Sequence, residues 1–168
     1  MIKYFLLLFI TLAFHSEAVT QTSITLSSVY HDYYLGLKEA KKVSKPILLW
    51  FTGNGCKENR DNQAMIIGNK EIVDKLNAEF ITIILYVDDR TRLSEVQIME
   101  RDGKQIKVRT HGGKWAHLQM TKYQSNRQPF ITVIDSAENS LLDLEPEEFS
   151  EKKFKMLLDR CLEIFRLQ

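Results

Sequence analysis

The residue with the clearest chemical potential is a cysteine placed where a helix is predicted to begin. Cys56 follows Gly55 in a glycine-broken turn, which itself follows the apolar run Ile47–Phe51. The partial positive charge of a helix N-terminus stabilises the thiolate, the nucleophilic form of cysteine. Lys57 also favours the thiolate, whereas Glu58 opposes it. We therefore expect Cys56 to be an accessible nucleophile with a pKa modestly below the free value of about 8.5. The alternative is an inert thiol in a domain without redox chemistry.

A second thiol that would complete a redox pair is missing from this stretch. Asn59 stands three residues after Cys56, where a Cys-x-x-Cys pair has its second cysteine. In such a pair, the second thiolate attacks the mixed disulfide formed by the first and releases the product. Here the release needs a partner protein's thiol, a small-molecule thiol or another cysteine of the substrate. This limit suits isomerisation, the holding of folding intermediates or deglutathionylation, and it does not suit dithiol reduction.

The other polar candidates favour structural roles. Cys161 lies on the apolar face of the last predicted helix, where a free cysteine packs as a small hydrophobe. A bridge between Cys161 and Cys56 would need Cα atoms within ~7 Å, which this placement disfavours. No cysteine or carboxylate completes a metal set around His111 and His117, and Asp88-Asp89 reads as a turn. We expect neither a metal nor a cofactor.

The elements that must position Cys56 alternate between helix and strand patterns. Apolar periodicity and turn residues predict a helix over 29–42, a strand over 47–51, helical residues from 56 to 79 broken at 68–69, a strand over 80–87, a turn at 111–113, a helix over 114–123, strands over 130–135 and 141–144, and a helix from about 146 to the C-terminal end. A polar insertion over residues 90–110 contains a predicted hairpin that turns at Asp102-Gly103. A strand–helix–strand unit implies a parallel pair. The fold class is therefore α/β, with a central mixed sheet flanked by helices.

The first residues predict an export signal. Lys3 precedes an apolar segment over residues 4–14, and Ser16-Glu17-Ala18 places small residues at the −3 and −1 positions of a cleavage site. An uncleaved anchor is the alternative, but the apolar run is shorter than the ~20 residues that span a bilayer. We expect a signal peptide over 1–18, a lead over 19–28 and one domain over 29–168. The mature protein would be periplasmic or secreted, without stable membrane insertion, in an oxidising compartment that preserves disulfides.

Composition indicates one globular domain and no nucleic-acid partner. The 168 residues are 44% hydrophobic and 27% charged, which is typical of a chain with a sizeable core. Twenty-three basic and 22 acidic residues leave a formal net charge of +1. Nucleic-acid binding would need a basic patch or stripe, which this balance does not suggest.

Several short motifs together resemble one protein family. They are Lys45-Pro46, Phe51-Thr52-Gly53, Gly55-Cys56, Arg60, Val87-Asp88-Asp89, Gly113-Lys114-Trp115 and Gln128-Pro129-Phe130. With the predicted order of elements, they resemble the thioredoxin-like C-terminal domain of bacterial thiol:disulfide interchange proteins of the DsbD type. The resemblance extends over roughly residues 30–165.

This resemblance implies a thioredoxin fold and a role for individual residues. Cys56 matches the nucleophilic cysteine of the family, and Asn59 occupies the place of the resolving cysteine. Pro129 matches a cis-proline beside the active thiol, and we expect Gln128 and Trp50 to border the same substrate groove. The implied activity is thiol–disulfide exchange on exported proteins that carry cysteines or disulfides.

Two alternatives to this activity stay open. One is a redox-inactive or chaperone-like binding module that uses the groove near Pro129 for extended peptides. The other is an accessory subunit whose partner supplies the missing thiol.

Overall fold

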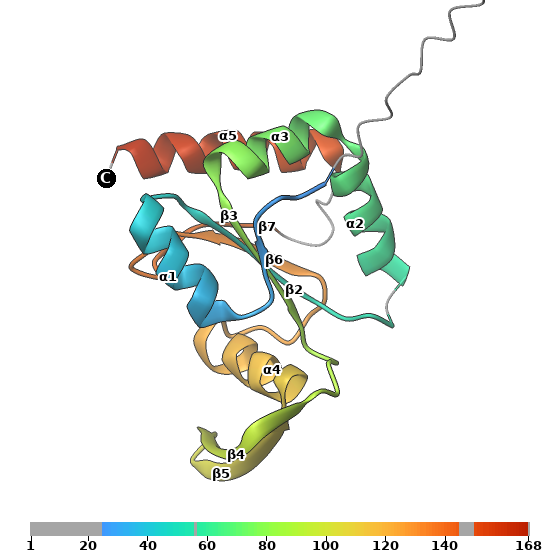
Figure 1. Cartoon of the computed structure of the whole chain (residues 1–168), viewed down its shortest axis with the longest axis vertical. Helices are drawn as coiled ribbons and strands as arrows, with labels where there is room; N and C mark the ends of the chain where they lie inside the picture. The colour runs from blue at the N-terminus through green and yellow to red at the C-terminus, as the bar shows by residue number, and fades with distance from the viewer. Residues whose placement is uncertain (1–24, 56, 145–149, 168) are drawn as a thin grey trace, which may run out of the picture.

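A five-stranded mixed sheet forms the centre of the protein (Figure 1). The structure is a computed structural model that describes residues 25–55, 57–144 and 150–167. The spatial order of the strands is β1 (Val29–Tyr30), β3 (Ile81–Tyr86), β2 (Ile47–Thr52), β6 (Phe130–Ile134) and β7 (Ser140–Leu144). β1, β3 and β2 are parallel, whereas β6 and β7 run antiparallel to their neighbours. The predicted parallel pair and central mixed sheet are confirmed.

The apolar run in β2 forms a central strand because helices cover both faces of the sheet. All six residues of β2 are buried. Since side chains alternate along a strand, Leu48 packs with residues of α2 (Lys57–Gly68), α3 (Lys70–Glu79) and α5 (Glu151–Arg166). Leu49 faces the opposite way and packs with α1 (Tyr33–Val43) and α4 (His111–Lys122). The two cores together hold the carboxyl end of β2 in place.

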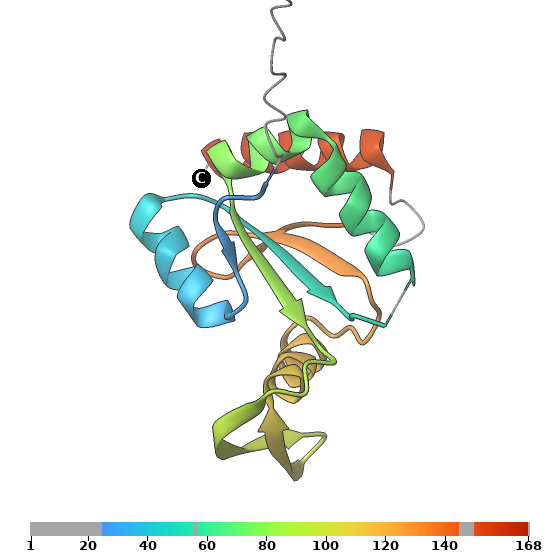
Figure 2. The ribbon, with the colours of Figure 1, turned by 45° about the vertical axis from the view of Figure 1, so that its right-hand side comes forward.

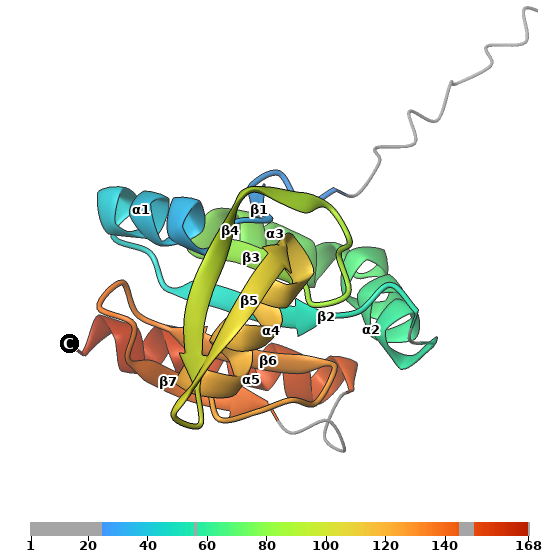
Figure 3. The ribbon, with the colours of Figure 1, turned by 90° about the horizontal axis from the view of Figure 1, so that it is seen from below.

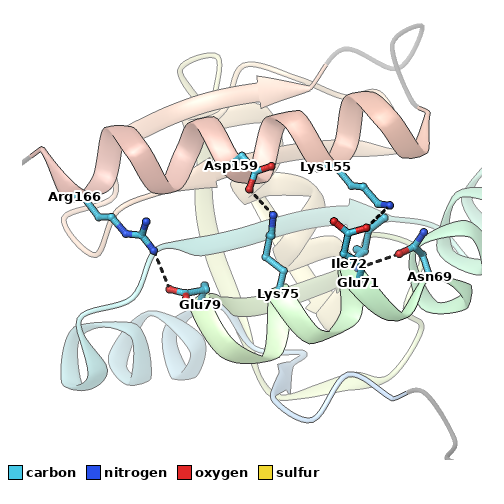
Figure 4. A network of polar contacts seen from close by, with 8 residues as sticks. All are labelled: Asn69, Glu71, Ile72, Lys75, Glu79, Lys155, Asp159 and Arg166. Atoms are coloured by element: carbon cyan, nitrogen blue, oxygen red, sulfur yellow. Dashed lines mark hydrogen bonds and ion pairs between the residues drawn. The ribbon is translucent and has the colours of Figure 1, made fainter.

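Ion pairs on the surface join α3 to α5 on the first of these faces (Figure 4). The pairs are Lys75 with Asp159, Lys155 with Glu71 at 2.6 Å, and Arg166 with Glu79 at 3.5 Å. Exposed pairs of this kind contribute about 0–1 kcal/mol each. Because each pair contributes so little, the association of α3 with α5 depends mainly on the apolar core beneath them, and the ion pairs only favour one alignment of the two helices.

A second, two-stranded sheet projects beyond α4 at one end of the molecule (Figure 2). It consists of β4 (Arg92–Arg101) and β5 (Lys104–Thr110). Arg101 pairs with Lys104, so the turn contains only Asp102 and Gly103, with φ values of 52° and 72°. Two positive φ values define the tight turn that suits an Asp-Gly hairpin. The predicted hairpin and its turn are confirmed.

Two predicted boundaries near helix starts are wrong, and side-chain caps explain both. The helix predicted over 29–42 begins at Tyr33, because the Asp32 carboxylate accepts hydrogen bonds from the first-turn amides of Tyr34 and Leu35. Residues 29 and 30 form β1 instead. The turn predicted over 111–113 is the first turn of α4, capped by Thr110, whose hydroxyl accepts from Gly113 N at 3.1 Å.

Other predictions fall wholly or partly outside the described residues. The signal peptide over 1–18, most of the lead over 19–28, and the helix start near residue 146 belong to this group. The described part of the last helix begins at Glu151, and Ser150 caps it by accepting from Lys153 N at 3.4 Å. Among the helices in the described ranges, none combines the length and apolar character that crossing a bilayer requires.

Candidate functional site

The loop that leads to Cys56 begins at the carboxyl end of β2. Thr52 ends this strand, and its carbonyl accepts a hydrogen bond from Val87 N, just beyond β3, at 2.9 Å. Cys56 itself lies outside the described residues. Its neighbours Gly55 and Lys57 are both exposed, and α2 begins at Lys57. The predicted strand–turn–helix arrangement around the cysteine is therefore confirmed on both sides of it.

The Asp88 carboxylate, in the segment that follows β3, forms hydrogen bonds with this loop. Its Oδ2 accepts hydrogen bonds from the backbone amides of Asn54 at 2.8 Å and Gly55 at 3.4 Å. Its Oδ1 accepts from Asn54 Nδ2 at 3.2 Å. Arg60 Nη1 donates to the Asn54 carbonyl at 3.4 Å from the first turns of α2. The sequence predicted only a turn former at Asp88, and the parallel register of β2 and β3 gives it this further role.

The segment that carries Asp88 is held in turn by the start of α4. Gly112 N donates to the Asp89 carbonyl at 2.9 Å, and His111 N donates to the Thr91 carbonyl at 2.9 Å. A Cβ atom on Gly112 would lie 2.5–2.7 Å from backbone atoms of Asp89 and Val87. Only glycine permits this approach, so α4 and the end of β3 form one packed unit.

Pro129 lies at the same end of the sheet as the loop over residues 53–55. The Gln128–Pro129 peptide bond is cis, as the resemblance implied. Phe130, the first residue of β6, pairs with Phe51 of β2 in the antiparallel ladder. Pro129 and the loop over residues 53–55, which the resemblance assigned to one site, therefore adjoin neighbouring strands at this end of the sheet.

The Gln119 side chain on α4 forms hydrogen bonds with the segment that precedes Pro129. Its side chain is 1% exposed on α4. Its Nε2 donates to the Arg127 carbonyl at 2.7 Å, and its Oε1 accepts from Gln128 Nε2 at 2.9 Å. Gln128 therefore directs its side chain toward α4. Sequence reasoning missed this positioning role, although a glutamine on the apolar face of a predicted helix was a signal for it.

Trp50 lies in the core, and its predicted place beside the groove needs correction. Its side chain is 2% exposed and packs in the cluster that contains Phe154 and Leu158 of α5. The alternation of β2 explains this, because Trp50 faces α5 whereas Phe51 faces the opposite core. Trp50 therefore has little surface to offer a substrate.

The charges at the start of α2 balance one another in part. Lys57 Nζ lies 2.5 Å from Asp61 Oδ2, and both side chains are exposed. Glu58 and Asn59 belong to α2, but their side chains are outside what the structure describes. Arg60, whose Nη1 donates to the Asn54 carbonyl, adds a positive charge to that of the N-terminus of α2.

Cys161 is a core residue, as predicted. It is fully buried among apolar residues that include Leu158 and Phe154. Burial raises the pKa of the Cys161 thiol to about 12, and the charge of Arg160 lowers it only in part. A buried, protonated thiol is neither a nucleophile nor a ready attacker of a disulfide.

A polar cluster outside this site connects α1, α4 and the turn between β6 and β7. Tyr33 donates to Glu138 Oε2 at 2.7 Å, its hydroxyl lies 3.0 Å from that of Tyr123, and Lys122 pairs with Glu138. Burial and these hydrogen bonds raise the pKa of Tyr33, and burial raises the pKa of Tyr123 to about 12. Burial alone would raise the pKa of Glu138, but the hydrogen bonds from Lys122 and Tyr33 hold it below its usual range.

The two histidines considered as metal ligands do not form a ligand set. His117 Nε2 lies 2.8 Å from the Glu100 carbonyl, and His111 is the first residue of α4. Within residues 25–55, 57–144 and 150–167, no group of three potential ligands is close enough to hold a metal ion.

The architecture is the thioredoxin fold. The chain is similar to a thioredoxin from Thermus thermophilus, with a TM-score of 0.55 and 14% identity over 83% of this chain and 90% of that one. It is equally similar to the DsbH oxidoreductase, with a TM-score of 0.55 and 16% identity over the same shares of the two chains. No protein-family model matches the sequence, and no curated protein matches it either. At these identities the likeness establishes the fold, which the sequence predicted.

Proposed function

We propose that this protein is an exported, monothiol thioredoxin-fold protein that takes part in thiol–disulfide exchange on exported proteins. The observation that carries the proposal is the convergence of cis-Pro129 and the loop over 53–55 at the N-terminal end of α2. Such an arrangement offers a helix N-terminus to a thiolate at Cys56 and an extended backbone segment to a substrate. From the resemblance to the C-terminal domain of DsbD-type proteins, the proposal takes the position of Asn59 as that of the resolving cysteine.

The proposed reaction begins with attack by the Cys56 thiolate on one sulfur of a substrate disulfide. A new disulfide forms between Cys56 and that sulfur, while the second substrate sulfur leaves as a thiolate and takes a proton from solvent. No net oxidation occurs in this step, because one disulfide replaces another. A second thiolate must then attack the mixed disulfide to regenerate Cys56.

The second thiol in this scheme comes from outside the chain. Cys161 is the only other cysteine in the sequence, and its burial and raised pKa of about 12 exclude it from this role. The resolving group is therefore a cysteine of the substrate, a small-molecule thiol or a partner protein's thiol. Attack by another substrate cysteine gives isomerisation. Reduction of the substrate needs two external thiols: the first attacks the Cys56 sulfur and releases the substrate thiolate, and the second frees Cys56 and leaves joined to the first in a disulfide.

Incubation of the protein with a glutathionylated cysteine peptide tests the proposal by intact-mass spectrometry. The expected result is an adduct on wild-type protein and on Cys161→Ala, removal of the adduct by excess glutathione, and no adduct on Cys56→Ser. The rate of Cys56 alkylation should rise with an apparent pKa below about 8.5. An inert Cys56, or a pKa at or above that value, would contradict the exchange function.

The same variants separate the alternative of a redox-inactive binding module. If the function is peptide binding alone, Cys56→Ser binds a reduced, unfolded protein as tightly as the wild type does, while the wild type forms no adduct. If exchange is the function, removal of the thiol abolishes covalent capture.

A further inference from the structure

The β4–β5 hairpin presents strand edges and one face that the described chain leaves uncovered. β4 is ten residues long and pairs with β5 alone. No described residue outside β5 forms a backbone–backbone hydrogen bond with residues 92–101. Unpaired strands of this length normally carry features that prevent association, or else they associate.

The outward face of the hairpin combines aliphatic and basic side chains. Val96 and Ile98 are 54% and 55% exposed, whereas Gln97 between them is half-buried. Ile98 pairs with Lys107 on β5, so these two side chains share the outward face, and Arg109 follows two residues later on the same side. Neither Lys107 nor Arg109 forms an ion pair with any residue in the described part of the chain. The face therefore holds exposed aliphatic groups beside two positive charges that form no ion pair, with the Glu100 carboxylate two residues from Ile98 on the same side.

The opposite face of the hairpin anchors it to the body of the protein. Met99 pairs with Ile106, and Val108 is 5% exposed where the hairpin packs against α4. His117 Nε2 of α4 lies 2.8 Å from the Glu100 carbonyl. Seen from below, the hairpin lies across α4 (Figure 3). Because α4 is hydrogen-bonded to Asp89 beside the candidate site, a molecule bound on the hairpin would be held at the same end of the protein as that site.

We propose that this outward face is a docking surface for a partner protein segment that carries both acidic and aliphatic side chains. The acidic groups would compensate Lys107 and Arg109, and the aliphatic groups would remove Val96 and Ile98 from water. A protein segment fits better than an anionic membrane, because an extended segment can also pair with the uncovered edges of the hairpin and a lipid surface cannot. The docking surface is independent of the thiol chemistry proposed for Cys56.

The test uses two synthetic peptides with Cys56→Ser protein, so that its result does not depend on thiol exchange. One peptide repeats Glu-Ser-Val-Ser three times, which places glutamate and valine on one face of an extended strand. The other repeats Lys-Ser-Val-Ser. Titration followed by NMR should show that the glutamate peptide binds, with shifts in residues 92–109, and that the lysine peptide does not.

A charge-reversal variant provides the decisive comparison of the affinities for the two peptides. The double variant Lys107→Glu/Arg109→Glu should bind the glutamate peptide about ten-fold or more weakly than wild type does. It should also gain affinity for the lysine peptide, and this gain shows that the variant is folded. The control Lys38→Glu/Lys152→Glu makes the same change in net charge at exposed sites on α1 and α5 and should leave both affinities unchanged. The proposal is overturned if the two peptides bind equally, or if the double variant keeps the wild-type preference for the glutamate peptide. It is also overturned if the protein binds anionic vesicles and not the glutamate peptide.

Discussion

Substitution of Asp88 tests whether the loop before Cys56 is held by one carboxylate. Asp88→Ala removes three accepted hydrogen bonds, of which the shortest is the 2.8 Å bond from Asn54 N and the longest is the 3.4 Å bond from Gly55 N. The site is exposed, so water replaces part of what is lost. We therefore expect a loss of about 1 kcal/mol in the stability of the closed loop, well below the sum for three buried bonds to a charged group.

This loss has a local signature that amide hydrogen exchange can measure. A change of about 1 kcal/mol raises the population of the open loop about five-fold, so the exchange rates of the Asn54 and Gly55 amides should rise by that factor. Asp88→Asn keeps one acceptor oxygen and should give a smaller increase. Urea unfolding should show a decrease of about the same 1 kcal/mol for Asp88→Ala.

Asp74→Ala is the matched control for this experiment. Asp74 is also exposed, and its carboxylate pairs with Lys70 one helical turn away at 2.5 Å. Its removal should change stability by no more than about 0.5 kcal/mol and should leave the amides of residues 54 and 55 unaffected. The reasoning is refuted if Asp88→Ala exchanges these amides at the wild-type rate, or if both variants accelerate them equally.

Three further predictions follow from packing and charge. Gly112→Ala should destabilise the fold by about 2 kcal/mol or more in urea unfolding, because its Cβ would meet backbone atoms at 2.5–2.7 Å, whereas Gly68→Ala, with open space around it, should be tolerated. Cys161 should resist alkylation in native protein and react only in denaturant, and equal rates in both conditions would contradict its burial. Glu138→Gln should lower the free energy of unfolding at pH 7, because the folded-state pKa of Glu138 is depressed and its ionised form stabilises the fold. The difference from wild type should shrink as the pH falls below the unfolded value of about 4.3 and vanish below the folded-state pKa, and a difference that persists in acid would exclude this origin.

Much of the fold could be read from local patterns, and most errors lie where a side chain caps an element. The apolar runs in β2 and β3 are short and bounded by turn residues, which favours buried strands, and Asp102-Gly103 is typical of a two-residue hairpin turn. The boundaries near Tyr33 and His111 were wrong because Asp32 and Thr110 each select the starting residue of a helix through hydrogen bonds. Apolar periodicity carries no information about such bonds.

At the candidate site, too, some features follow from the residue types and others only from tertiary contacts. The residue types predicted a reactive thiol at Cys56, and the sequence has Asn59 where a Cys-x-x-Cys pair would have its second cysteine. Only the tertiary structure decided which distant groups support that place, since the links from Asp88 to Asn54 and from Gln119 to Gln128 depend on strand register and helix packing. It also moved Trp50 from the groove into the core, because the direction of a buried strand residue is set by which face of the sheet each helix covers.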